Sequence, residues 1–123
     1  MAGWLILYEP EIYPGGQVLV PDFVGWRRER LAGQPKSEWA AITPDWVCEI
    51  LSPSTALRDR TVKKAIYEDH GVGHLWLVDP LHMTVEVFRL DSGRWVEAGV
   101  FGGDEKARIE PFQDIEKIGR AHV

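Results

Sequence analysis

Three residues have the types and the spacing that metal-dependent cleavage of a phosphodiester needs. Asp22 follows Pro21, Glu49 lies within the apolar run "WVCEIL", and Lys63 lies in the polar segment that comes next. Mg²⁺ uses one or two protein carboxylates and keeps several waters, so two strand carboxylates can hold it. A bound metal lowers the pKa of water, and a lysine can stabilise the charge of the phosphate. Asp22, Glu49 and Lys63 are therefore the candidate catalytic residues, with the two acids as metal ligands.

Glu49 and Lys63 could also have purely structural roles. An ionised carboxylate inside an apolar strand is costly unless it is paired, hydrogen-bonded or metal-bound. Glu49 could instead pair with a basic residue of the following helix, or end its strand in water. Asp59, Lys63 and Tyr67 recur at i, i+4 and i+8, which makes a polar stripe, and Lys63 could simply pair with Asp59. Spacing alone leaves these alternatives open.

Serine and histidine residues suggest two further kinds of site. Ser52 and Ser54 lie at a strand-to-helix turn, but no glycine flanks them as in a nucleophile elbow. The spacing of His70, His74 and His82 matches no zinc-binding pattern. We therefore expect turn, capping and loop roles for these residues, and a serine hydrolase that uses Ser54 and a histidine is the third hypothesis.

The composition predicts one globular domain of the α/β or α+β class. The chain has 123 residues and is 45% hydrophobic, which suits a small domain with a real core. Its single cysteine, Cys48, lies in an apolar run, so we expect a buried reduced thiol and no disulfide. No segment has the roughly 18 apolar residues of a membrane span, and the start lacks a signal-peptide pattern. We expect a cytoplasmic protein with no membrane partner.

Charge is unevenly distributed along the chain. The net charge of −5 argues against a general polyanion binder. Residues 26–64 nevertheless carry eight Lys or Arg against five Asp or Glu. Arg27, Arg28 and Arg30 follow a predicted strand, where they could contact nucleic-acid phosphates or form an ordinary solvated surface.

Alternation of apolar residues and turn signals predict six strands and one long helix. The helix should run from about residue 56 to residue 70, with Ser54 or Thr55 as its cap and Gly71 at its end. Its apolar Val62, Ala65 and Ile66 should face the sheet. "RRERLAGQPKSE" reads as a polar loop, and "DSG" as a hairpin turn. Strands are expected at residues 4–8, 18–26, 45–51, 74–80, 84–90 and 94–101.

Long segments of the chain resemble a known family. "VLVPDFVGWRRERL", "PDWVCEILSPSTALRDRTVKKAIYEDHGVGHLWLVDP" and "TVEVFRL" resemble the Uma-type family of putative restriction endonucleases, a branch of the PD-(D/E)XK nuclease superfamily. The resemblance extends from Trp4 to about Phe112. It implies a restriction-endonuclease-like mixed β-sheet flanked by helices. It also implies Asp22 and Glu49 as metal ligands, with the backbone carbonyl of Ile50 as a further ligand.

The chain departs from the superfamily pattern at one catalytic position. The pattern has a lysine two residues after the glutamate, and Leu51 stands there in this chain. The resemblance therefore implies that the lysine of the next helix, Lys63, takes this role. Lys64 is the other claimant, and it is also a candidate nucleic-acid contact together with Arg27 and Arg28.

The ends of the chain differ from what the resemblance leads us to expect. Relatives carry an N-terminal helix ahead of the segment where this chain begins. The last six residues, "IGRAHV", look like the translation of a sequencing-adapter read-through. We therefore expect one partial domain over residues 1–117 and a non-native tail over residues 118–123.

Together these features predict a Mg²⁺- or Mn²⁺-dependent endonuclease that hydrolyses phosphodiester bonds in nucleic acid, with DNA as the expected substrate. A homodimer would suit the cutting of both strands of a duplex. No base-reading pattern is visible. The alternative is a non-catalytic remnant of a nuclease fold that binds nucleic acid or protein.

Overall fold

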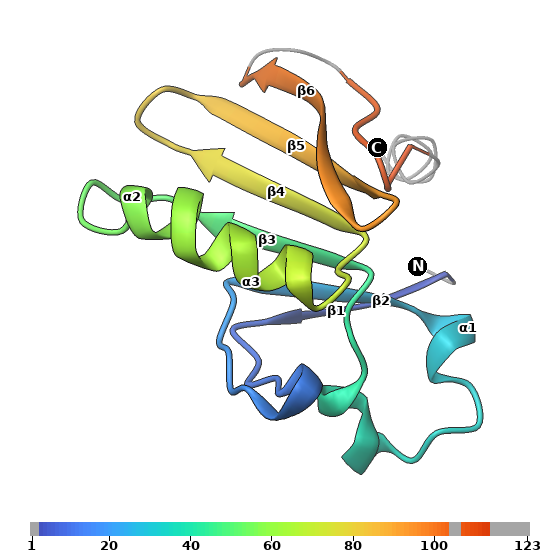
Figure 1. Ribbon diagram of the computed structural model, residues 1–123. Helices are drawn as coiled ribbons and strands as arrows, with labels where there is room; N and C mark the ends of the chain where they lie inside the picture. Colours follow the sequence, from blue (N-terminus) through green and yellow to red (C-terminus); the bar gives the residue numbers. More distant parts are fainter. Residues whose placement is uncertain (1–2, 104–106, 114–123) are drawn as a thin grey trace.

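The computed structural model describes residues 3–103 and 107–113 of the chain. It contains a six-stranded mixed sheet in which the strands follow one another in chain order (Figure 1). Neighbouring strands are antiparallel except β3 and β4, which are parallel. The strands are β1 (Trp4–Tyr8), β2 (Phe23–Arg27), β3 (Trp46–Ile50), β4 (His74–Asp79), β5 (Thr84–Asp91) and β6 (Arg94–Gly102). The predicted α+β fold with a mixed sheet is confirmed.

A helical run between β3 and β4 supplies the crossover that a parallel pair requires. It consists of α2 (Ala56–Arg58), the π-helical turn η3 (Asp59–Lys63) and α3 (Lys64–Asp69), and it lies across one face of the sheet (Figure 1). The predicted extent of the helix is confirmed, and it ends before Gly71, whose φ is +79°. The predicted side-chain cap is wrong, because Thr55 makes no capping hydrogen bond. Its Oγ1 instead accepts a hydrogen bond from the Ser52 amide at 3.2 Å.

The helix packs on the sheet with a different side from the one predicted. Val62 is 48% exposed and Ala65 is also exposed, whereas Tyr67 is 1% and Asp59 is 2% exposed. The polar stripe therefore faces the sheet, and only Ile66 of the predicted apolar face is half-buried. A tyrosine ring buries more area than the small Val and Ala side chains, which favours this packing.

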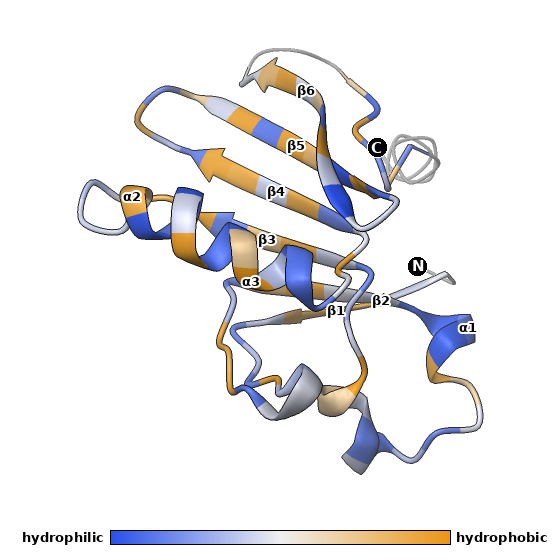
Figure 2. Ribbon diagram, viewed as in Figure 1, coloured by the Kyte–Doolittle hydropathy of each residue, from blue (hydrophilic) through white to orange (hydrophobic). Residues whose placement is uncertain are grey.

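Apolar side chains cover both faces of the central strands. Hydrophobic residues dominate β3 and β4 (Figure 2). On the helix side, the core contains Val47, Leu51, Tyr67, Val72, Leu75, Leu77 and Phe88. On the opposite side it contains Trp4, Trp46 and Cys48, with Trp76 and Phe112 packed against them. Burial raises the pKa of the Cys48 thiol to about 12, so this residue is the buried, protonated thiol that its position predicts.

The N-terminal half is less regular than predicted. The expected strand over residues 18–26 begins only at Phe23, after Pro21, and Leu19 forms an isolated bridge with Ile12. A proline cannot donate a ladder hydrogen bond, which accounts for the late start. The short helices η1 (Pro14–Gly16), α1 (Arg28–Leu31) and η2 (Lys36–Ala41) occupy turns and the predicted polar loop. They help to enclose a second cluster formed by Ile12, Val24, Trp26 and Leu31.

The hairpin between β5 and β6 agrees with its predicted turn. Ser92 and Gly93 separate the two strands, with φ values of +53° and +80°. Two positive φ angles are typical of a type I′ turn. Among the described residues, no helix is both long enough and apolar enough to cross a membrane.

Candidate functional site

Strand pairing brings the two predicted acids together. Phe23 of β2 pairs with Cys48 of β3 at the end of the antiparallel ladder. Asp22 and Glu49 come directly after this last pair, and the charge of Asp22 acts on Glu49. Oδ2 of Asp22 also accepts a hydrogen bond from the backbone amide of Ile50 at 2.6 Å. Both carboxylates therefore lie at the end of the sheet where β3 ends.

Glu49 is buried and has two partners on the crossover helix. Its side chain is 2% exposed. The Tyr67 hydroxyl donates a hydrogen bond of 2.5 Å to Oε2, and Nζ of Lys63 lies 3.6 Å from the same oxygen. Burial raises the pKa of Glu49 to about 7, although the Tyr67 hydrogen bond and the Lys63 charge both lower it. The negative charges of Asp22 and Asp59 add to the rise.

Lys63 lies between two buried carboxylates. Its Nζ is 3.1 Å from Oδ1 of Asp59 as well as 3.6 Å from Oε2 of Glu49. Burial lowers the pKa of Lys63, but the charges of Glu49 and Asp59 outweigh burial, so the net shift is upward. Oδ1 of Asp59 accepts no hydrogen bond of good geometry from the described residues, so its contact with Lys63 is an ion pair alone. The pair with Asp59 and the approach to Glu49, which were alternatives on sequence grounds, occur together.

The local helix geometry sets these contacts. Asp59 and Lys63 begin and end the π-helical turn, and Tyr67 follows in α3. Short π-helical segments are frequent at functional sites. Burial, with the charge of Glu49, raises the pKa of Tyr67 far above its ordinary value. Tyr67 therefore stays protonated and acts as the donor to Glu49.

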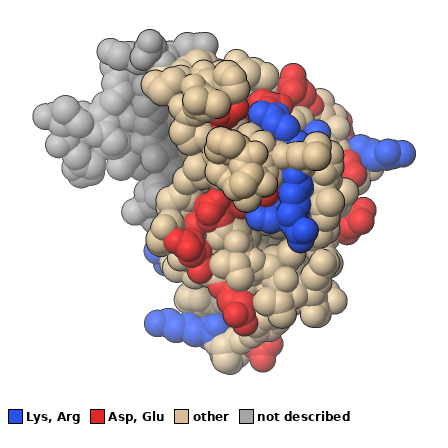
Figure 3. Space-filling view, turned by 90° about the vertical axis from the view of Figure 1, so that its left-hand side faces the viewer, with Lys and Arg blue, Asp and Glu red and all other residues tan. Residues whose placement is uncertain are grey.

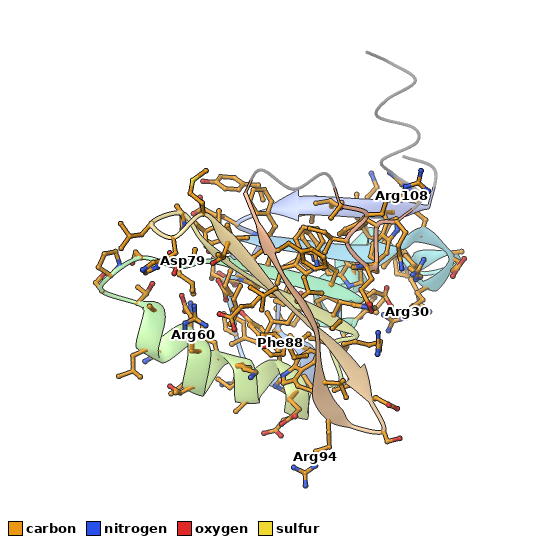
Figure 4. The ribbon with its side chains drawn as sticks, turned by 90° about the horizontal axis from the view of Figure 1, so that it is seen from above. Arg30, Arg60, Asp79, Phe88, Arg94 and Arg108 are labelled. Carbon is orange, nitrogen blue, oxygen red and sulfur yellow. The ribbon has the colours of Figure 1, made fainter. Side chains whose placement is uncertain are left out.

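The three predicted arginine contacts lie away from the acids. Arg27 ends β2 whereas Asp22 precedes it, which separates them by roughly 17 Å at about 3.4 Å per residue. The guanidinium of Arg27 lies 4.6 Å from the centroid of the Trp4 ring, and Arg28 begins α1 next to it. Arg30 lies at the opposite end of the sheet from Arg60 (Figure 4).

Two other charged residues, Asp45 and Lys64, have contacts away from Asp22 and Glu49. The second "PD" acid, Asp45, accepts a hydrogen bond from the Arg27 amide at 2.7 Å and pairs with Arg30 at 2.9 Å. Nζ of Lys64 lies 4.0 Å from the centroid of the Phe88 ring, so Lys64 extends toward β5 rather than toward Glu49.

A second ionic cluster, which the sequence analysis missed, adjoins the site. Arg60 pairs with Glu86 of β5 and lies 3.9 Å from Asp79 at the end of β4. Arg60 and Asp79 lie together at one end of the sheet (Figure 4). On the face of the molecule that Figure 3 shows, Lys and Arg side chains gather together and Asp and Glu side chains lie beside them. Arg60 and Lys63 were both expected on one helix. Only the arrangement of the strands shows that Arg60 pairs with acids of β4 and β5, whereas Lys63 pairs with Glu49 of β3.

The candidate serine and histidine residues are used locally. Oγ of Ser52 lies 3.1 Å from Oγ of Ser54 and 2.9 Å from Oγ1 of Thr55. A pocket of about 140 Å³ is lined by Ser52, Asp79 and His82 together with apolar side chains. Nδ1 of His82 lies 2.8 Å from Oδ2 of Asp79, but no hydrogen bond joins His82 to Ser52 among the described residues.

The three histidines do not converge. Nε2 of His70 lies 3.2 Å from Oε1 of Gln17, and Nε2 of His74 lies 2.8 Å from Oε2 of Glu110. Over residues 3–103 and 107–113, no group of three or more His, Cys, Asp or Glu side chains is placed to hold a metal.

The donors of Asp22 and Glu49 fit a hard divalent cation. Both are carboxylates, and Mg²⁺ is bound in proteins through one or two such groups. Among the described residues, no hydrogen bond is donated to Oε1 of Glu49, whereas Tyr67 donates to Oε2, which is also 3.6 Å from Nζ of Lys63. The negative charges of three acids, Asp22, Glu49 and Asp59, act on the ammonium of Lys63. A divalent cation would offset this excess of negative charge.

Comparisons with known proteins show the family to which the chain belongs. The model of the Uma2 family, described as putative restriction endonuclease, matches residues 3–118. The chain belongs to the Uma2 family. No curated protein matches this Uma2 chain.

A solved structure is similar to this Uma2 chain along most of its length. It is a putative nuclease belonging to DUF820 from Anabaena variabilis ATCC 29413, with 27% sequence identity and a TM-score of 0.70. The similarity covers 93% of the Uma2 chain and 64% of the solved chain. The Uma2 chain thus spans less than two thirds of the length of that protein. The expected non-native residues 118–123 lie outside the described residues.

Tyr67 is the residue of the site to which the sequence analysis gave no role. Its position in the i, i+4, i+8 stripe with Asp59 and Lys63 was visible. The cost of burying Glu49 was the signal that could have identified it, because a buried carboxylate requires donors. That requirement favours packing the polar stripe, rather than the apolar one, against β3.

Proposed function

We propose that this chain is an endonuclease that uses Mg²⁺ or Mn²⁺ to hydrolyse phosphodiester bonds in DNA in the cytoplasm. The observation that carries the proposal is the position of Glu49, which is close enough to Asp22 to feel its charge and lies 3.6 Å from Lys63. Membership of a family described as putative restriction endonucleases supports the reaction class. The site supports a metal-dependent reaction because acids and a lysine meet at one strand end.

Asp22 and Glu49 would hold the divalent cation, with the backbone carbonyl of Ile50 as a further ligand. When bound, the cation lowers the pKa of a water molecule and offsets phosphate charge. Asp22 holds the Ile50 amide at 2.6 Å, which fixes the backbone next to both acids. A positioned group of this kind costs no reorganisation when charge develops during the reaction.

Lys63 supplies the positive charge that the superfamily pattern places two residues after the glutamate. Asp59 and Glu49 keep its ammonium charged by raising its pKa. They also hold Nζ beside Oε2 of Glu49. From there the ammonium would stabilise the negative charge that develops on the phosphate, or orient the attacking water.

Three further basic residues, Lys64, Arg27 and Arg28, would contact the DNA outside the metal site. Lys64 lies on the same helix as Lys63 and would contact a phosphate near the site. Arg27 and Arg28, at the other end of β2, would contact a more distant stretch of the same duplex. A homodimer would supply one such site for each strand.

The test compares cleavage of plasmid and single-stranded DNA by wild type and by three variants, in Mg²⁺, in Mn²⁺ and in a chelator. Glu49→Gln and Lys63→Met should lose cleavage by at least about 100-fold, as expected when a metal ligand or a charge-stabilising group is removed. Asp45→Asn is the matched control, because this acid pairs with Arg30 away from the site. It should cleave like wild type.

Two outcomes would contradict the proposal. Cleavage that survives Glu49→Gln would show that another site, or a contaminating nuclease, is responsible. DNA binding without cleavage by the wild type in either metal would favour the non-catalytic binding module.

A further inference from the structure

The hydroxyl of Tyr67 is directed at the proposed metal ligand from inside the core. Tyr67 is 1% exposed and belongs to α3. Its hydroxyl lies 2.5 Å from Oε2 of Glu49. Both residues are buried, so water does not compete for this hydrogen bond. A short hydrogen bond to a charged acceptor is among the stronger ones in proteins.

The two oxygens of Glu49 have different surroundings. Oε2 receives the Tyr67 hydroxyl and faces Nζ of Lys63. Oε1 accepts no hydrogen bond from the residues that the structure describes. An ionised carboxylate has about four lone-pair sites, so Glu49 retains acceptor capacity on Oε1. One oxygen is tied to the helix, and the other is available to a ligand.

The surroundings of the Tyr67 ring restrict its movement. The ring belongs to the core cluster that also contains Val47, Leu75 and Leu77. The backbone carbonyl of Tyr67 accepts a hydrogen bond from the Val72 amide at 3.1 Å, which closes the end of the helix. A close-packed ring cannot swing away without opening a cavity. The hydroxyl therefore has one available position relative to β3.

We propose that Tyr67 is a positioning residue, which holds Glu49 through Oε2 so that Oε1 is presented to a divalent cation shared with Asp22. This inference rests on the proposed function. Partners that orient a metal-ligating group typically contribute 10- to 100-fold to metal affinity or activity. Tyr67 would thus act through Glu49 without contacting the cation or the DNA.

The experiment measures Mn²⁺ affinity in the absence of DNA, by calorimetry or by the electron paramagnetic resonance of free Mn²⁺. Tyr67→Phe removes only the hydroxyl and keeps the ring in the core. We expect it to weaken Mn²⁺ binding about 10-fold or more, within the range for such partners. Tyr13→Phe is the matched control, because Tyr13 is 38% exposed and has no contact with Glu49. It should bind Mn²⁺ like wild type.

Two further readouts separate positioning from a purely structural role. In DNA cleavage, Tyr67→Phe should raise the Mg²⁺ concentration for half-maximal rate and leave the KM for DNA unchanged. In wild type, the NMR signal of the Tyr67 hydroxyl proton should shift as Mg²⁺ saturates the site. This second measurement does not depend on the folding of any variant.

The failure of the inference can be distinguished from the failure of the proposed function. If wild type binds Mn²⁺, Glu49→Gln does not, and Tyr67→Phe binds as tightly as wild type, the role of Tyr67 is overturned while the function stands. If the NMR signal of the Tyr67 hydroxyl proton does not shift at saturating Mg²⁺, the role of Tyr67 is likewise overturned while the function stands. If wild type binds no Mn²⁺, the metal-dependent function and this inference are overturned together.

Discussion

Asp22 holds the backbone of Ile50 through a hydrogen bond of 2.6 Å from the Ile50 amide to Oδ2. The contact joins the start of β2 to the end of β3, at the point where the regular ladder between Phe23 and Cys48 stops. Asp22 therefore does two things. It carries a negative charge beside Glu49, and it accepts the amide that follows Glu49.

Two substitutions separate these roles of Asp22. Asp22→Asn keeps a carbonyl oxygen that can accept the Ile50 amide, whereas Asp22→Ala leaves that amide without its partner. We expect Asp22→Ala to lose about 1 kcal/mol of unfolding free energy relative to Asp22→Asn, the usual net value of a hydrogen bond. Both should lose metal binding and cleavage, since neither carries the charge. Urea denaturation measures the difference in unfolding free energy. Equal stability of the two variants would show that the hydrogen bond from the Ile50 amide to Asp22 does not stabilise the fold.

Lys63 and Lys64 are adjacent in the chain but should respond differently to replacement by methionine. Lys63→Met leaves Glu49 and Asp59 without a cation, and breaking a buried ion pair from one side costs about 3 kcal/mol. Lys64→Met removes only the cation that lies over the Phe88 ring, which is worth about 0.5–1 kcal/mol.

Denaturation at pH 8 and plasmid cleavage measure both effects. We expect Lys63→Met to lose stability and cleavage, and Lys64→Met to retain most of both. A Lys64→Met variant that loses cleavage while Lys63→Met keeps it would give the catalytic role to Lys64. That result would also place the catalytic site near Phe88 of β5, which Lys64 contacts, rather than at Glu49.

The strands and the helix were largely predictable because their signals are local. The apolar run around Glu49, the alternation in β4 to β6 and the glycine at residue 71 each act over a few neighbouring residues. The late start of β2 at Phe23 follows from Pro21, which cannot donate a ladder hydrogen bond although the apolar pattern of residues 18–26 continues through it. The side on which the helix packs was mispredicted, because hydrophobic periodicity ignores the cost of burying Glu49 without donors.

The site was predictable only in part, because its members meet through strand pairing. Asp22 and Glu49 are 27 residues apart in the chain, and only the antiparallel pairing of Phe23 with Cys48 next to them brings them together. The resemblance to a family named them before the register was known. Arg27 lies at the end of β2 that is remote from Asp22. This separation follows from the direction of the strand, which the amino-acid composition does not reveal.

Phe112 should stabilise the face of the sheet opposite the helix. Its ring centroid lies 4.7 Å from that of Trp4, 4.8 Å from Trp46 and 5.5 Å from Trp76. Because the ring is only partly buried, we expect Phe112→Ala to lose about 2–3 kcal/mol, somewhat below the value for a fully buried Phe. Tryptophan emission should shift to longer wavelength as water reaches the indoles. Phe112→Leu should show a smaller change in both, and unchanged emission in Phe112→Ala would show that this packing is absent in solution.

The raised pKa of Glu49 predicts an unusual dependence of stability on pH. The pKa is 4.5 for an ordinary Glu side chain and about 7 in the folded chain. Between these values, the folded state binds more protons at this position than the unfolded state. Stability from this group is therefore greatest below pH 4.5, and it is lost as the pH rises from about 4.5 to 7. The total loss is on the order of 3 kcal/mol, at about 1.4 kcal/mol per pKa unit.

Glu49→Gln isolates this contribution, because Gln has the size of Glu and does not titrate. The unfolding free energy of wild type minus that of Glu49→Gln, measured in chelator, should fall as the pH rises from 5 to 8. Other titrating groups largely cancel in this difference. Adding Mg²⁺ should reduce the fall in the wild type, since a ligand that binds the folded state stabilises it. A difference that is flat with pH in chelator would mean that Glu49 is already ionised at pH 5, with its charge offset by Lys63 and Tyr67 alone.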